Sequence, residues 1–376
     1  MRGHAGRGHS TCDGWSTPTS GSTTTGSLDA GGAIAAEPPA RIHRARAEET
    51  QMTRPTVSVV IATYQRATFV EECLAHLERQ TVRPVRTIVV DASPDTATRD
   101  VVARHAGVEY RRNERGIGTT ATSRAIGVAD LEEDVVAFLD DDAFAQPDCL
   151  EELLKPYDDQ AVAAVGGRAL NDQPGEDREG LGQIGLLLPD GRLTGFFAAD
   201  PGRVLDVDHM LGANMSVRMS VVRELGGIRD LYPGTCLREE TDIALRMRRA
   251  GMRIVYTPFA VVRHVAGVYA KGRRFDARYR YFGARNHVVL LATTLGYRDP
   301  HFRSWMRTAA RQIGRNVIDG VRSIGDPERP DLRSKARGLA GGGWRAVVDT
   351  AGTAAGVVAS ARDVSRLRRA SRGPER

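Results

Sequence analysis

Cysteine is scarce in this chain of 376 residues. Its cysteines lie far apart, so they form none of the short-spaced Cys or Cys/His sets that bind zinc or carry out thiol redox chemistry. A zinc module and a thiol redox protein are therefore excluded, and a reducing cytoplasm is the expected setting. The four cysteines are Cys12, Cys73, Cys149 and Cys236.

Long apolar runs are absent as well. No uncharged stretch approaches the roughly 20 residues that a membrane-spanning helix needs. No apolar segment follows the arginines near the start, so we expect no secretory signal. Residues 1–54 are rich in Gly, Ser, Thr, Ala and Arg without an apolar period, which predicts a disordered segment.

The most informative feature that is present is an apolar run ending in three carboxylates. Residues 135–139 read VVAFL and lead directly into Asp140, Asp141 and Asp142. The run predicts a strand buried on both faces, and ligands gather outside the carboxyl ends of such strands in open α/β sheets. Carboxylates are hard donors for Mg²⁺ or Mn²⁺. A helix N-cap or a solvated acidic turn is the alternative.

Three further strands surround this run and predict an α/β fold. We expect strands at residues 57–63, 85–90 and 108–110, and a helix from Thr68, whose spacing to Glu71 is that of a capping box. The alternating pattern argues for a parallel sheet with right-handed crossovers. The apolar face of the helix is Val70, Cys73, Leu74 and Leu77.

A second acidic group lies at the expected start of a later helix, near Arg238. Glu239 and Glu240 fall in its first turn, where the helix dipole favours ionised carboxylates. Asp242 lies four residues before Arg246, a spacing that favours an ion pair. The predicted apolar stripe is Ile243, Met247 and Ala250. An acidic first turn that only complements the helix dipole is the alternative to a catalytic role.

Four segments of the chain resemble, in their order and spacing, the motifs of family 2 glycosyltransferases. These segments are residues 59–66, 88–93, 138–142 and 238–242. The resemblance covers roughly residues 55–290. It implies a GT-A fold: a Rossmann-like, mixed but mostly parallel central sheet with flanking helices. We accordingly divide the chain into the N-terminal segment 1–54, a GT-A domain at 55–275 and a basic helical extension at 276–376.

The resemblance implies a metal-dependent, inverting transfer of a sugar from a UDP-, dTDP- or GDP-sugar to an acceptor hydroxyl. Such a reaction would serve the synthesis of a cell-surface polysaccharide, glycolipid or glycoside. Asp142, Asp140 and His264 are the implied ligands of Mn²⁺ or Mg²⁺. A hydrogen-bonded histidine without metal is the alternative for His264.

The remaining site residues also follow from the resemblance. Alignment makes Glu240 the base, with Glu239 as the second candidate. The donor nucleotide would be bound by Thr63, Tyr64, Arg66, Asp91, Arg124, Asp140 and Asp141, with Asp91 accepting a hydrogen bond from a ring N–H. The pocket for the acceptor and donor sugar would be lined by Gly212, Ala213 and Asn214.

Two other functions fit parts of the sequence. A sugar-nucleotide pyrophosphorylase would share the acidic metal site, but it should carry a Gly-rich phosphate loop where this chain has residues 63–66. A catalytically degenerate binding protein is favoured by Ala125, which stands where the family usually has Asn. The Gly-rich residues 116–121 match a dinucleotide fingerprint but follow the third strand, so we expect a loop beside the donor instead.

The specificity-determining elements are less defined. Residues 168–201 show no periodic core, and Pro189–Gly191 predicts a hairpin turn, so this insertion either sets specificity or forms a mobile lid. Trp305, Tyr279 and Tyr281 could stack on sugar or, as is commoner for helical aromatics, belong to the core.

The net charge of +6 arises mainly from residues beyond 263. Basic helices there could rest on anionic lipid, which suits a lipid-linked acceptor and a location at the inner face of the membrane. A solvated helical tail is the alternative, and no nucleic-acid recognition module is visible. Residues 338–343 are expected to break the region into two pieces. The arginines that begin it are Arg273, Arg274, Arg278, Arg280 and Arg285.

Deletion of residues 1–51 tests the expected division of the chain. Because this segment lacks an apolar pattern, the shortened protein should unfold cooperatively and keep its melting temperature. A thermal melt followed by circular dichroism measures this. Loss of the cooperative transition would mean that the segment is part of the folded structure.

Overall fold

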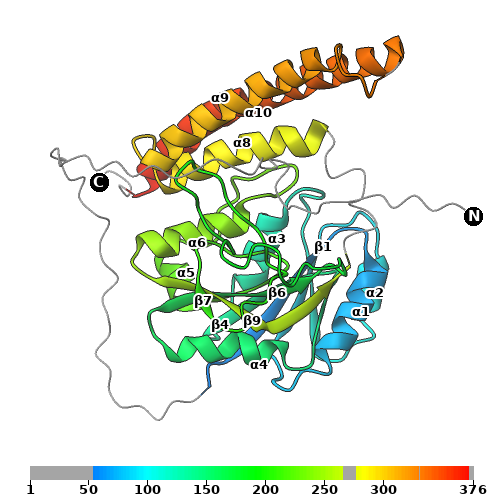
Figure 1. Cartoon of the computed structure of the whole chain (residues 1–376). Coiled ribbons are helices and arrows are strands. Elements are labelled where there is room, and N and C mark those ends of the chain that lie inside the picture. The colour runs from blue at the N-terminus through cyan, green and yellow to red at the C-terminus, as the bar shows by residue number, and fades with distance from the viewer. Residues whose placement is uncertain (1–53, 266–276, 330, 372–376) are drawn as a thin grey trace, which may run out of the picture.

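The structure is a computed structural model that describes residues 54–265, 277–329 and 331–371. A central sheet carries helices on both faces, and three further helices lie across one side (Figure 1). The segment predicted to be disordered, residues 1–54, lies outside the described residues except for Arg54. The basic residues Arg273 and Arg274 also lie outside them.

The N-terminal half of the sheet is parallel, as the alternating pattern predicts. Its strand order is β3-β2-β1-β4, and β1 pairs in parallel with both β2 and β4. These strands are β1 (Val57–Thr63), β2 (Thr87–Asp91), β3 (Val108–Arg112) and β4 (Val135–Asp140). The helices between them are α1 (Ala67–Leu77), α2 (Ala97–Val102) and α3 (Thr120–Val128).

The second half of the sheet is mixed. β8 pairs antiparallel with β4, and β6 then joins β8 to the long strand β9. The short strand β5 pairs antiparallel with the end of β9. These strands are β5 (Ala143–Ala145), β6 (Val162–Leu170), β7 (Leu205–Asp206), β8 (Asn214–Arg218) and β9 (Arg253–His264). The helices are α4 (Cys149–Leu154), the 3-10 turn η1 (Lys155–Asp158), α5 (Met219–Glu224) and α6 (Glu239–Arg249).

Alternation along β1 builds a core on each face of the sheet. Val59 and Ile61 pack with the predicted apolar face of α1, whereas Val60 packs on the other side with Phe138 of β4. Both strands are buried along nearly their whole length, which confirms the interpretation of the apolar runs.

Two predicted details of this region are wrong. Helix α1 begins at Ala67 with Arg66 as its N-cap residue, so Thr68 lies inside the first turn and forms no capping box. The carboxylate of Glu71 instead pairs with Arg104. Strand β2 begins at Thr87, and the side chain of Val85 is 61% exposed before it.

The insertion at residues 168–201 contributes to the core, although its sequence shows no core period. Ile184 and Phe197 are buried in the cluster that includes Tyr256. The predicted hairpin is present, because Leu187 and Leu193 form an antiparallel bridge around Gly191. The carbonyl oxygen of that glycine lies 2.7 Å from a ring nitrogen of His287, so the hairpin is joined to the helices beyond it.

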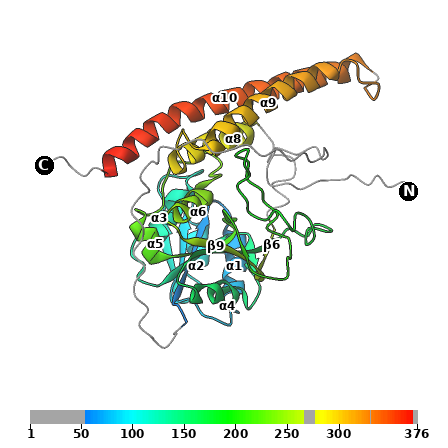
Figure 2. The ribbon, with the colours of Figure 1, turned by 60° about the vertical axis from the view of Figure 1, so that its left-hand side comes forward.

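Residues 277–329 and 331–371 of the C-terminal extension form three helices: α8 (Ala277–Thr294), α9 (Pro300–Arg322) and α10 (Leu332–Ser371). Helices α9 and α10 form an antiparallel hairpin that lies over α8 and projects beyond the sheet domain (Figures 1 and 2). The buried carboxylate of Asp349 joins all three helices, since it accepts hydrogen bonds from Arg280 and, at 2.7 Å, from Asn316.

The expected break at residues 338–343 is wrong, because α10 runs through these glycines without interruption. A Cβ atom on Gly342 would lie 2.5 Å from the carbonyl oxygen of Asn316 on α9. The glycines therefore permit close helix–helix approach rather than ending the helix. None of the helices in the described part of the chain is apolar over enough of its length to cross a bilayer.

Asp349→Ala tests the packing of this extension. The substitution leaves Arg280 and Asn316 without their buried acceptor, so the free energy of unfolding should fall by about 3–5 kcal/mol. Urea unfolding measures the change. The matched control is Asp319→Ala on the exposed side of α9, which should stay within about 0.5 kcal/mol. Equal stability of the two variants would contradict the assigned role of Asp349.

Candidate active site

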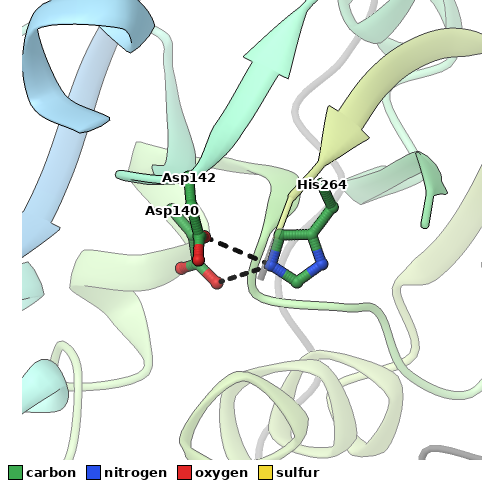
Figure 3. A group of neighbouring side chains, drawn as sticks. All are labelled: Asp140, Asp142 and His264. Carbon is green, nitrogen blue, oxygen red and sulfur yellow. Dashed lines mark ion pairs between the residues drawn. The ribbon is translucent and has the colours of Figure 1, made fainter. Parts of the chain in front are cut away.

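Three side chains with metal-ligating atoms converge at the carboxyl ends of the strands (Figure 3). Asp140 ends β4, Asp142 follows it, and the pairing of β5 with β9 places His264 opposite Ala143. Nε2 of His264 lies 3.3 Å from an oxygen of Asp142 and 4.0 Å from one of Asp140. Two carboxylates and an imidazole suit a divalent ion such as Mn²⁺. The structure thus brings the three predicted ligands together.

Arg66 supplies positive charge to the acidic turn. Its Nη1 lies 2.8 Å from Asp141 and 2.7 Å from Asp142, and the hydroxyl of Thr63 donates to Asp141 at 2.6 Å. Burial raises the pKa of Asp141 to about 7 despite these partners. Burial also opposes ionisation of Asp142, but His264 and Arg66 together hold its pKa below the usual value. Asp142 is therefore the better anionic ligand of the two.

Arg124 connects Asp140, one of the predicted metal ligands, to the second acidic group. Its side chain is 3% exposed, and it forms an ion pair with Glu239 of α6. The same guanidinium donates to the carbonyl oxygen of Gly212 at 2.8 Å and lies 3.4 Å from Asp140. One buried cation therefore holds α3, α6 and the end of β4 in a fixed arrangement.

Helix α6 begins where the sequence predicts. Arg238 precedes it with a φ of +88°, a left-handed conformation that is unusual for a residue with a side chain and that recurs at functional sites. Burial raises the pKa of Glu239 to about 8 and also raises the pKa of Glu240. Both lie close enough to Asp140 for its negative charge to add to this effect.

Asp242 has the structural role that its spacing predicts. Its carboxylate accepts a hydrogen bond from Arg246 at 2.7 Å and another from the hydroxyl of Tyr232 at 2.8 Å. Arg246 also donates to the carbonyl oxygens of Leu225 and Gly227. These contacts hold α6 against the loop that precedes it, and they leave the two glutamates as the candidate bases.

The predicted nucleobase-binding edge is formed by the ends of β1, β2 and β3. Asp91 is fully buried and accepts hydrogen bonds from the amide of Ser93 at 2.8 Å and from the hydroxyl of Tyr110 at 3.0 Å. Strand β3 extends to Arg112, two residues further than predicted, so this arginine pairs in register with Asp91. Tyr110 and Arg112 were not predicted as site residues; the polar run Glu109–Arg112 directly after Val108 was the available signal.

The residues predicted for the sugar pocket lie beside Asp140. The carbonyl oxygen of Ala213 lies 3.4 Å from the amide of Asp140. Asn214 is fully buried, and its amide nitrogen donates to the carbonyl oxygens of Arg168 and Ala260 at 3.1 and 2.9 Å. These contacts support the strand ends, and the pocket role of the segment stays a prediction.

The predicted aromatic residues and the Gly-rich turn lie in three different places. Trp305 is 3% exposed and packs on His287, so it belongs to the core. Tyr279 and Tyr281 are half-buried on α8. The Gly-rich turn at 116–121 packs against the loop before α6, where a Cβ on Gly118 would lie 2.8 Å from the carbonyl oxygen of Gly234.

Comparison with known proteins identifies the class. The family described as Glycosyl transferase family 2 matches residues 58–226. Glucosyl-dolichyl phosphate glucuronosyltransferase of Haloferax volcanii is 30% identical over 227 residues, which are 55% of this chain and 68% of that protein. The protein is a glycosyltransferase of the GT-A fold. More particularly, the chain belongs to glycosyl transferase family 2.

Two other relatives have a similar level of identity. O-antigen chain rhamnosyltransferase WbaN of Salmonella anatum is 30% identical over 216 residues, which are 56% of this chain and 66% of that protein. Pre-mycofactocin glycosyltransferase of Mycobacterium tuberculosis is 30% identical over 49% of this chain and 38% of its own length. The chain thus spans less than two thirds of either relative.

Asp141→Asn tests the electrostatics of the site. Because the pKa of Asp141 is raised to about 7, the folded state binds a proton that the unfolded state has released above about pH 4. This contribution lowers stability as the pH rises through that window, by at most about 1.4 kcal/mol per pH unit.

The substitution should therefore stabilise the metal-free protein relative to wild type at pH 7.5 and not at pH 4. Thermal melts in EDTA across this range measure the difference. The control is Asp148→Asn, an exposed carboxylate. A stability difference between Asp141→Asn and wild type that does not change with pH would contradict the assigned pKa.

Proposed function

We propose that the protein is a metal-dependent, inverting glycosyltransferase that uses a nucleoside-diphosphate sugar. One observation carries the proposal: Arg124 contacts both Asp140, which belongs to the ligand set with Asp142 and His264, and Glu239, which precedes Glu240 in the first turn of α6. A site for the leaving group and a base for the incoming hydroxyl would then lie near the same buried guanidinium. A transfer reaction needs both of these groups at the same carbon atom.

The donor would lie across the ends of β1, β2 and β4. A divalent ion bound by Asp140, Asp142 and His264 would neutralise charge that develops on the departing diphosphate. Arg66 places a second positive charge beside Asp142 and can turn to a phosphate oxygen. Asp91 would accept the ring N–H of uracil, thymine or guanine, beside Tyr64. For this contact to form, the hydrogen bond from the hydroxyl of Tyr110 to Asp91 must break.

Glu240 would act as the base. Burial raises its pKa toward the working pH, which is the condition for efficient proton transfer from a hydroxyl. Glu239 is held by Arg124 and so would position the first turn of α6 rather than take the proton. As the acceptor oxygen forms its bond to the anomeric carbon, the bond to the diphosphate breaks on the opposite face. The product therefore has the inverted configuration.

The acceptor would be a hydroxyl group of a lipid-linked or cell-surface glycan. Two relatives support this choice through their names, which specify an O-antigen chain and glucosyl-dolichyl phosphate. Gly212 and Ala213, next to Asp140, would border the space between donor sugar and acceptor. Synthesis of a polysaccharide, glycolipid or glycoside at the inner face of the membrane is the corresponding role.

Measurements of donor binding and of turnover test the metal site and the base separately. Thermal melts with UDP-, dTDP- and GDP-sugars, with and without Mn²⁺, should show a metal-dependent rise in melting temperature for one nucleotide. Asp142→Ala should abolish this rise. Glu240→Gln should keep it but lower release of the nucleoside diphosphate by about 10²-fold or more, because only the base is lost.

Glu239→Gln is the matched variant for the base assignment. It removes the partner of Arg124 but leaves Glu240, so it should lower turnover less than Glu240→Gln does. Near-full turnover of Glu240→Gln would transfer the role of base to Glu239. A donor-induced rise in melting temperature with no turnover in the wild type would instead favour a degenerate binding protein.

A further inference from the structure

The exposed face of α10 is apolar over about five turns. Trp344 and Val347 are each 60% exposed, and Val358 is 53% exposed. These residues belong to a stripe at alternating spacings of four and three, which defines one helix face. The stripe is Ala340, Trp344, Val347, Ala351, Ala354 and Val358. Between Gly338 and Ala361 the chain has only two charged residues, Arg345 and Asp349, and Asp349 is buried.

This stripe points away from the rest of the protein. On the opposite side of α10, Gly352 and Gly356 approach α8 so closely that a Cβ would lie 2.5 Å from the carbonyl oxygen of Tyr281 and 2.7 Å from that of Arg285. Both views place the α9–α10 hairpin outside α8, away from the sheet (Figures 1 and 2). The apolar stripe is therefore an outer surface of the molecule.

Helix α9 adds apolar and basic groups to the hairpin. Val317, Ile318 and Val321 are 47%, 50% and 54% exposed. Exposed arginines border them along the helix: Arg303, Arg307, Arg311, Arg315 and Arg322. Residues 300–371 contain 14 Lys and Arg against six Asp and Glu. A second copy of this surface would carry the same charge and be repelled, whereas an anionic surface would be attracted.

We propose that the α9–α10 hairpin docks on an anionic lipid bilayer. The apolar stripe of α10 and the exposed apolar residues of α9 lie in the boundary between headgroups and acyl chains, and the arginines contact lipid phosphates. Tryptophan favours this boundary region. Docking needs no catalytic activity. Only its consequence, delivery of a lipid-linked acceptor to the site, rests on the proposed function.

Vesicle flotation of the full chain tests the proposal. Vesicles of phosphatidylcholine mixed with phosphatidylglycerol should bind the protein at least about tenfold more tightly than phosphatidylcholine alone, and high salt should weaken the binding. The double variant Trp344→Ser/Val347→Ser should lose about tenfold or more in affinity, because it removes the two most exposed large apolar side chains of the stripe. Its circular dichroism and melting temperature should match the wild type.

Two controls make the result specific. Val85→Ser removes an equally exposed apolar side chain from the sheet domain and should leave vesicle binding unchanged. The rise in melting temperature caused by donor and Mn²⁺, measured without vesicles, reports on the sugar-nucleotide site alone. An intact donor response without vesicle binding would refute the docking proposal and leave the proposed function standing.

Two other outcomes would also overturn it. Equal binding to neutral and anionic vesicles would remove the role of the arginines. A concentration-dependent dimer that the double variant abolishes, measured by sedimentation in the absence of lipid, would make the stripe an interface between two copies of the chain.

Discussion

The ion pair between Arg124 and Glu239 is the interaction on which the geometry of the site depends. Both groups are almost completely buried, so neither can be left alone without the large cost of an unpaired charge. The same guanidinium reaches Asp140 and the carbonyl oxygen of Gly212, and a Cβ on that glycine would press on it at 2.8 Å. The end of β4, with Asp140, and the first turn of α6, with Glu239 and Glu240, are thereby fixed to each other.

Charge balance follows from this arrangement. Each of two arginines forms ion pairs in a different half of the site. Arg66 pairs with Asp141 and Asp142. Arg124 pairs with Glu239 and Asp140. The remaining negative charge lies around His264, which faces Asp142 at 3.3 Å. A divalent ion would compensate this charge, since Asp140, Asp142 and His264 offer it three ligand atoms. The fold thus supports a metal at one place only among the described residues.

The sequence predicts the local parts of this site better than its long-range contacts. Strands β1 and β4 and helix α6 follow from apolar periods, and the ion pair of Asp242 with Arg246 follows from helical spacing. No period indicates that residues 124 and 239 meet, because the separate packing of α3 and α6 on the central sheet decides it. The prediction of a helix break at residues 338–343 failed for a similar reason. The role of the glycines there is determined by close packing against helix α9 and not by local helix propensity.

Binding of Mn²⁺ to the protein tests the central claim most directly. Electron paramagnetic resonance of Mn²⁺ titrated into the wild type should show one bound ion per chain. His264→Gln should weaken this binding strongly, although its side chain keeps nearly the same volume. Asp148→Asn, on the surface, should bind as the wild type does. Undiminished binding by His264→Gln would contradict the assignment of Asp140, Asp142 and His264 as a single metal site.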